Sequence, residues 1–213
     1  MNNLALLFFG IFSVVASSWV GLVWTAHVQY GDLQPSTQQL DEETGAFLSG
    51  EPFFPRQFLG LAEQGKQTYI TLGCAVCHTQ QVRQPGLWSD YTRGYGERPS
   101  VARDYIRQER VLTGFLRIGP DLANVGKRRD DPQWYYRYLY NPASVVEGST
   151  KPHYPFLFEQ RSDRDSSKPV RPGPRAEALV AYLLSLRQDY DLPEAQRSDW
   201  QKKPSRPDQE MHH

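Results

Sequence analysis

The chain has 213 residues and carries 24 basic and 24 acidic side chains, so its formal net charge is zero. A neutral chain without basic runs interleaved with aromatic residues gives no reason to expect a nucleic-acid partner. Hydrophobic residues make up 39% of the chain, but they are unevenly distributed. The length suits one compact domain with appendages.

The first predicted element is an apolar segment near the N-terminus. Residues 4–26 contain no charged side chain. As a helix they would span about 34 Å at a rise of about 1.5 Å per residue, which exceeds the roughly 30 Å hydrocarbon core of a bilayer. We therefore predict a transmembrane anchor over residues 1–28, in contact with membrane lipid. A cleaved signal peptide is the competing interpretation, because small residues at 16–18 resemble a processing site, but the apolar run is long and no basic residue precedes it.

The remaining chain divides into three predicted parts. Residues 29–57 contain several prolines and no sustained periodicity, which indicates a linker. Residues 58–188 carry the helical patterns and are predicted to form the folded domain. Residues 189–213 are polar and aperiodic, which predicts a flexible C-terminal tail.

Three helices are predicted within the domain. The first begins near Phe58 and delivers Cys74 at its C-terminal end. The second begins with Asp131 as the N-cap and stops at Asn141, before a proline. The third is GPRAEALVAYLLSLRQ, in which leucines at spacings of three to four form one face. The intervening loops, 79–130 and 143–173, are long for a compact domain, so we expect a buried prosthetic group to organise them.

The stretch GCAVCH contains both cysteines of the chain. Cys74, Cys77 and His78 match the C-x-x-C-H signature of c-type haem attachment. Two thiols one helical turn apart can each bond the macrocycle, and the next residue can ligate the iron. A redox disulfide or half of a zinc site is the alternative, but a structural zinc site normally needs four such ligands and no second cysteine pair exists. The sequence therefore predicts one covalently bound haem c, with His78 as the proximal iron ligand.

Four separated stretches, in order, resemble subunit II of the cbb3-type haem-copper oxidases, the membrane-anchored monohaem cytochrome c subunit. They are GKQTYITLGCAVCHTQQVR, RIGPDLANVG, NPASVVEGSTKPHYPFLFE and EALVAYLLSL. The resemblance extends over residues 1–188. It implies a mainly α fold, in which a single transmembrane helix precedes a cytochrome c-like domain with long loops around one haem.

The resemblance also implies a function. The chain would be a respiratory-chain subunit of a bacterial inner membrane, with its haem domain on the periplasmic side. It would pass electrons from another cytochrome c subunit or a soluble donor toward the haem-copper catalytic subunit, without being catalytic alone. Two further site residues follow from the same resemblance: the Pro120 carbonyl would accept a hydrogen bond from His78, and Arg83 could contact a haem propionate.

The distal ligand is the point at which the sequence departs from the family. Where the family pattern reads Met-Pro-x-Tyr-Pro, this chain reads KPHYP, so that Lys151 replaces methionine and His153 follows two residues later. The only methionines, Met1 and Met211, are poorly placed. At pH 7 a lysine with an ordinary pKa near 10.4 costs about 4.6 kcal/mol to deprotonate, whereas a histidine costs a few tenths. Protonation therefore favours His153 and register favours Lys151, and an open iron is the third outcome.

Three other functions remain open at this point. The small cytochrome c subunit of a nitric-oxide reductase shares the plan of anchor and haem domain. A haem-based gas or redox sensor would require an open distal site. The third is a structural subunit whose haem no longer carries electrons. Its haem would be reduced more slowly than the complex turns over.

Overall fold

The computed structural model describes residues 3–36, 53–84, 86, 88–159, 171–192 and 194–195. The chain divides into two compact units, residues 1–35 and 36–213. Each unit is described by itself below.

The first unit is one continuous apolar helix. It consists of α1 (Leu4–Trp19), a π-helical turn η1 (Val20–Trp24) and α2 (Thr25–Tyr30). In η1 the backbone hydrogen bonds join residues five positions apart. The Thr25 hydroxyl also donates to the carbonyl of Val20 at 2.9 Å. The helix is long and apolar enough to cross a membrane, and none of its most apolar window is buried within the chain. It ends two residues beyond the predicted anchor boundary at 28.

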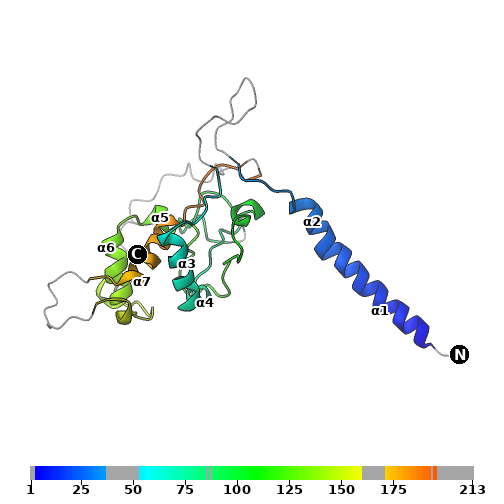
Figure 1. Ribbon diagram of the computed structural model, residues 1–213, viewed down its shortest axis with the longest axis horizontal. Coiled ribbons are helices and arrows are strands. Elements are labelled where there is room, and N and C mark those ends of the chain that lie inside the picture. The colour runs from blue at the N-terminus through cyan, green and yellow to red at the C-terminus, as the bar shows by residue number, and fades with distance from the viewer. Residues whose placement is uncertain are drawn as a thin grey trace, which may run out of the picture. The chain divides into compact units, whose positions relative to one another are not determined.

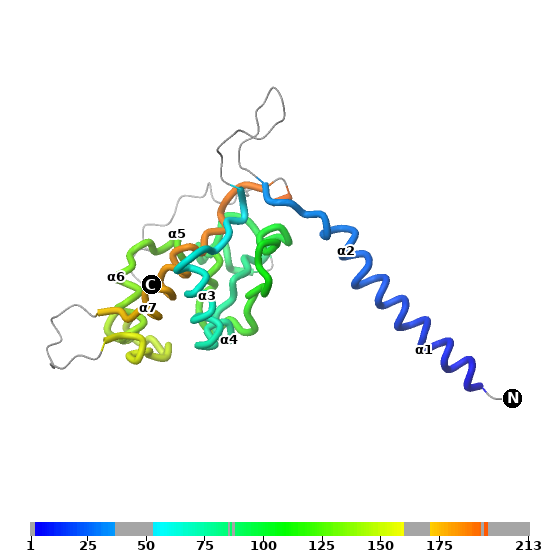
Figure 2. The backbone as a smooth tube through the Cα atoms, in the orientation of Figure 1, coloured from blue at the N-terminus to red at the C-terminus, as the bar shows by residue number. Residues whose placement is uncertain are grey.

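The second unit is built from short helices and long connections, and its described residues contain no β-strand. Its elements are α3 (Leu61–Thr71), α4 (Cys74–Cys77), η2 (Ala102–Tyr105), α5 (Val125–Arg128), α6 (Pro132–Tyr140), η3 (Pro142–Ser144), η4 (Pro155–Leu157) and α7 (Pro174–Ser185). Figure 1 shows α3 beside α7. Figure 2 shows that the chain between α4 and α5, in green, runs largely without helices. The predicted mainly helical class is confirmed.

The crossing of α3 and α7 forms the centre of the core. Tyr69 of α3 and Tyr182 of α7 are both at most 1% exposed, and their ring centroids lie 5.4 Å apart. The helices approach closely at Gly65, where an added Cβ would lie 1.8 Å from the Ala178 carbonyl oxygen. A residue larger than glycine at position 65 would therefore push α3 and α7 apart.

The predicted start signals of α6 and α7 are confirmed. The Asp131 carboxylate accepts a hydrogen bond from the amide of Gln133 at 2.8 Å, and a proline occupies the first turn of each helix. Such a cap satisfies an amide that the helix itself leaves free. The predicted leucine face of α7 is buried together with Tyr182. Arg187 lies just past the helix, where its Nε still donates to the Leu184 carbonyl at 3.2 Å.

The predicted start of the flexible tail at residue 189 is too early. Tyr190 is 4% exposed, and its ring stacks on that of Phe54 with centroids 4.5 Å apart. The Tyr190 hydroxyl donates to Asp104 at 2.6 Å, and the Arg98 guanidinium donates to the Tyr190 carbonyl at 2.6 Å. These contacts join positions more than 80 residues apart, so local composition could not indicate them. Residues 196–213 of the predicted tail lie outside the described residues.

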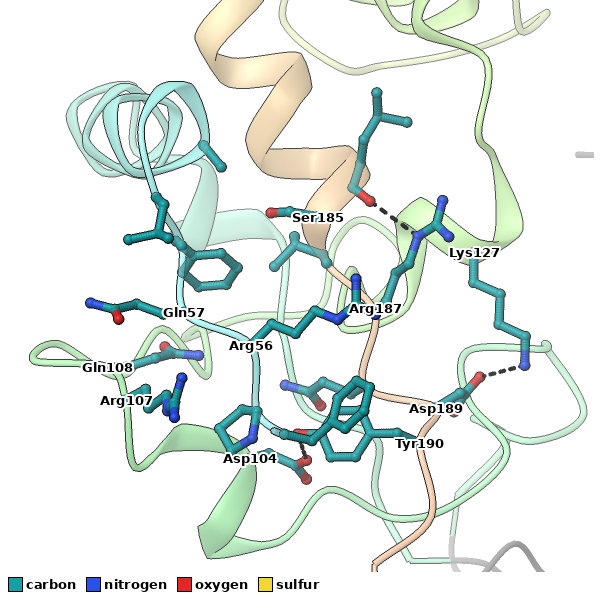
Figure 3. A pocket seen from close by; sticks show the side chains of 18 residues that line it. Arg56, Gln57, Asp104, Arg107, Gln108, Lys127, Ser185, Arg187, Asp189 and Tyr190 are labelled. Carbon is teal, nitrogen blue, oxygen red and sulfur yellow. Dashed lines mark hydrogen bonds and ion pairs between the residues drawn. The ribbon is translucent and has the colours of Figure 1, made fainter. Parts of the chain in front are cut away.

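The same region corrects the end of the predicted linker 29–57. The backbone of Phe54 exchanges two hydrogen bonds with Ser36, and the segment from Phe54 to Phe58 lines a hollow of about 710 Å³ beside the end of α7 (Figure 3). The Lys127 amine and the Asp189 carboxylate form an ion pair of 3.3 Å at its edge. Phe54 and Tyr190 thus belong to the folded domain. Residues 37–52 lie outside the described part of the chain.

Candidate functional site

The cysteine motif forms a separate helical turn, and is not the end of α3 as predicted. Helix α3 ends at Thr71, and Gly73 adopts the left-handed conformation with φ of 70° before α4 begins at Cys74. Glycine tolerates this conformation because it has no Cβ. The turn brings Cys74 and Cys77 to one side, and both cysteines are unpaired and half-buried.

His78 is held by the backbone at Pro120, as the family resemblance implied. Its Nδ1 lies 2.8 Å from the Pro120 carbonyl oxygen. Because a carbonyl can only accept, Nδ1 is the protonated nitrogen, and Nε2 keeps its lone pair. Burial lowers the pKa of His78, and the bond to Pro120 acts in the opposite direction. The described residues offer Nε2 no hydrogen-bond partner, so this nitrogen is available to a metal.

Gly119 makes the approach of this segment to the histidine possible. An added Cβ at position 119 would lie 2.3 Å from Cε1 and 2.7 Å from Nδ1 of the His78 ring. Both separations are far below van der Waals contact. The Gly119 amide also donates to the Cys77 carbonyl at 2.9 Å. The backbone of Gly119 therefore packs directly against the imidazole ring, and the Pro120 carbonyl accepts its hydrogen bond.

Further backbone bonds hold the same strip of chain along the cysteine turn. Phe115 donates to the carbonyl of Ala75 at 3.0 Å, and Leu116 donates to that of Val76 at 3.1 Å. These carbonyls belong to a helix of only four residues and cannot be satisfied within it. The strip 115–119 thus satisfies the carbonyls of the turn and fixes its orientation.

A buried charge network, which sequence reasoning missed, lies behind His78. Asp121 is fully buried and accepts hydrogen bonds from the Thr79 hydroxyl at 2.6 Å and the Gln81 amide at 2.8 Å. Arg117 donates to Thr79 at 2.8 Å and to Asp121 at 3.2 Å. The network joins the residues that directly follow His78 to the residue that follows Pro120. It therefore fixes both ends of the His78-Pro120 hydrogen bond.

Arg83, predicted to contact a haem propionate, has protein partners in the structure. Its Nη2 lies 3.0 Å from Asp90, and its guanidinium lies 3.7 Å from the centroid of the Trp88 ring. Arg117 also donates to Asp90, which is fully buried. Arg83 thus helps to compensate a buried carboxylate. The propionate contact stays a prediction.

Asp90 provides a pH-dependent test of this network. Burial alone would raise its pKa, but hydrogen bonds from Arg83 and Arg117 outweigh burial and lower it. A carboxyl group whose pKa is lowered on folding stabilises the protein above its unfolded pKa of about 3.9, and this contribution is lost as the pH falls through the folded value. We expect Asp90→Asn to lower the free energy of unfolding by about 2 to 3 kcal/mol at neutral pH, somewhat less than for a fully buried pair because both arginines are partly exposed.

The measurement is denaturant unfolding of the full chain in detergent, at about pH 7 and about pH 3. The difference between the unmodified chain and Asp90→Asn should shrink at the lower pH, which lies below the unfolded pKa of about 3.9 and closer to the lowered folded pKa of Asp90. Asp130→Asn, at an exposed position, is the matched control. Equal losses in the two variants at neutral pH would contradict the role given to Asp90.

The structure separates the two candidates for the distal ligand. His153 is exposed, whereas the Lys151 amine is buried and lies 4.6 Å from the centroid of the Tyr154 ring. Burial lowers the pKa of Lys151 to about 8. Deprotonation at pH 7 then costs about 1.4 kcal/mol, compared with about 4.6 for an ordinary lysine. The protonation cost that favoured His153 in the sequence is largely removed.

The side chains around the cysteines are suited to a haem. Burial raises the pKa of Cys74 to about 11, and the positive charge of Lys151 opposes this rise. The free nitrogen of His78 and the Lys151 amine are nitrogen donors without hydrogen-bond partners among the described residues. The buried Tyr69 hydroxyl also lacks a partner there. Together these side chains provide two thiols and two nitrogen ligands, which fits a covalently attached haem.

This arrangement fits the class of membrane-anchored monohaem c-type cytochromes: it has an apolar N-terminal helix, a helical domain and one Cys-x-x-Cys-His turn with a backbone-anchored histidine. Residues 54–172 match the family model described as "Cytochrome C oxidase, mono-heme subunit/FixO", and the chain belongs to this family. The match covers more than half of the chain and confirms the resemblance found in the sequence. No match is found among curated proteins. The family is a mono-haem subunit of an oxidase complex, so haem and an oxidase partner are supported.

Proposed function

We propose that this chain is the electron-transfer subunit of a membrane-bound terminal oxidase. It carries one haem c, attached through Cys74 and Cys77, with His78 as the proximal ligand, and it delivers electrons toward a haem-copper catalytic subunit. Electrons enter from another cytochrome c subunit or a soluble donor. The chain is a carrier within the complex and is not catalytic by itself.

The observation that carries this proposal is the support of His78 in a chain of the mono-haem oxidase family. The 2.8 Å contact with Pro120 fixes the imidazole tautomer, and Gly119 leaves room for the ring. A hydrogen bond to the outer nitrogen of a ligating histidine orients the ring and strengthens it as a donor. When bound, the haem supplies a one-electron iron couple. The protein's part is to hold the ligands rigidly, which the network of Arg117 and Asp121 supports.

Access for a redox partner is consistent with this function. The strip along the cysteine turn presents apolar side chains to the outside: Phe115 is 85% exposed and Ile118 is 72% exposed. Val76, within the turn itself, is 48% exposed. Exposed apolar surface of this kind is typical of interaction sites. A partner could therefore come close to the attached group.

The N-terminal helix supports a location at the membrane. We propose that Leu4–Tyr30 is a single-pass anchor in the bacterial inner membrane and that the haem domain lies on the periplasmic side. Covalent haem attachment outside the cytoplasm, as the family resemblance implies, would require this orientation. The two cysteines would then meet an oxidising compartment only as the haem-bound pair.

Rapid mixing of the purified oxidase complex tests the function directly. The fully oxidised complex is mixed with reductant and oxygen, and the absorbance of haem c is followed together with oxygen consumption. If the chain carries the electrons, reduction of its haem must be at least as fast as steady turnover. A haem c that is reduced more slowly than the complex turns over would contradict the proposal and indicate a structural role.

A further inference from the structure

The Lys151 amine is the most unusual polar group near the cysteine motif. Its Nζ is inaccessible to solvent and has no hydrogen-bond partner among the described residues. An ammonium group carries three donors, and a buried charge without a partner is costly. The ion pairs of the described residues do not include Lys151, so no carboxylate there compensates it. The described residues therefore give the ammonium form no hydrogen-bond acceptor, whereas the neutral amine has a lone pair that an electron-pair acceptor such as a metal ion could take.

Two aromatic rings surround this amine. Nζ lies 4.6 Å from the centroid of the Tyr154 ring and 5.2 Å from that of Tyr138 in α6. The loop is also tied down on both sides of the lysine. The Lys151 amide donates to the Ser149 hydroxyl at 3.4 Å, and the Tyr154 amide donates to the Leu139 carbonyl at 2.9 Å. The backbone and the rings therefore hold the side chain in its inward position.

Lys151 occupies the position of the family's methionine in the KPHYP stretch, and its amine is buried. Its positive charge also opposes the rise in the pKa of the Cys74 thiol. His153, the other nitrogen donor of the loop, is exposed. The two methionines of the sequence lie at positions 1 and 211, both outside the described residues.

We infer that Lys151 is the sixth ligand of the haem iron, so that the chain forms a His/Lys cytochrome c. This inference rests on the proposed function, since it requires the haem held by Cys74, Cys77 and His78. On ligation the ε-ammonium releases one proton to solvent, and the nitrogen lone pair forms the bond to iron. Methionine ligation is associated with a raised reduction potential. Exchange of sulfur for an amine therefore lowers the potential of this haem relative to a His/Met site.

Spectroscopy of the full haem-loaded chain in detergent tests the inference. The unmodified ferric protein should be low-spin. It should lack the long-wavelength charge-transfer band that appears when a methionine sulfur ligates the haem iron. Lys151→Ala should become high-spin and, when reduced, should bind carbon monoxide readily. Lys151→Met, which restores a thioether, should stay low-spin, gain the sulfur band and show a higher midpoint potential. His153→Ala is the matched control and should leave the spectrum unchanged.

Each contrary result identifies a different error. A low-spin Lys151→Ala protein overturns the inference, and a high-spin His153→Ala protein would then identify His153 as the ligand. An unmodified chain that is high-spin and binds carbon monoxide shows an open site and also overturns it. If Lys151→Ala fails to fold, Lys151→Met decides the question, because it must gain the sulfur band. Absence of haem from the unmodified chain would overturn the proposed function itself, whereas an unaltered spectrum in Lys151→Ala overturns the lysine ligand alone.

Discussion

Replacing Gly119 by alanine should remove normal haem ligation from the full chain. The new methyl group would lie 2.3 Å from Cε1 of His78, so either the ring or the strip 115–119 must move. The ring is fixed by its hydrogen bond to Pro120, and the strip is fixed by its bonds to the cysteine turn. Overpacking of this kind costs about 1 to 3 kcal/mol of stability. We expect a large loss of haem content, and a displaced histidine in any haem protein that remains.

The measurement is the haem content and visible spectrum of Gly119→Ala purified in detergent. Gly21→Ala is the matched control, because it makes the same exchange where an added Cβ meets nothing within 4 Å. The control should bind haem like the unmodified chain. Full haem content and an unchanged spectrum in Gly119→Ala would mean that His78 does not rest against this segment.

The local elements of the fold were readable from the sequence. Asp131 followed by proline predicted the start of α6, and the leucine spacing predicted α7 and its buried face. These features depend on neighbouring residues, so a single sequence contains the required information. The break at Gly73 was missed because helical periodicity continues through it. The glycine was the available signal, since a glycine after a helix often adopts a left-handed conformation.

The long loop 79–130 was expected to depend on a buried prosthetic group. In the structure its own charged residues also organise it. The fully buried Asp104 pairs with the buried Arg98 at 2.7 Å, and Asp121 and Asp90 collect hydrogen bonds from several segments. Buried charges are stable only when paired in this way, but sequence alone does not show which residues pair. A sequence rich in charged residues otherwise indicates a solvated loop.

In the candidate site, too, some residues can be predicted from neighbouring sequence, whereas others depend on contacts between distant segments. Cys74, Cys77 and His78 follow from a five-residue motif, and Pro120 followed from the family resemblance. The choice between lysine and histidine depends on side-chain burial, which is set by α6 and the loop together. From the sequence, we could estimate only the cost of deprotonating a lysine or a histidine with an ordinary pKa. Burial of the Lys151 amine lowers that cost, and the exposure of His153 leaves Lys151 as the buried nitrogen of the loop.

Removal of both thiols should abolish covalent haem binding. Cys74 and Cys77 lie on one short turn and are the only cysteines of the chain, so no other side chain can replace their thioether bonds. Each single variant, Cys74→Ser or Cys77→Ser, keeps one bond and should retain haem at reduced yield. The double variant should retain none. Val76→Ser is the matched control, because it places a serine at an exposed position of the same turn and leaves both thiols intact.

The most direct measurement is the mass and haem stain of the full chain after denaturation, with the pyridine haemochrome spectrum for the type of attachment. If the chain is a monohaem cytochrome c, we expect one bound haem per chain in the unmodified protein and in Val76→Ser. The double serine variant should carry no haem. An unmodified chain without haem, or haem that stays on the double variant, would contradict it.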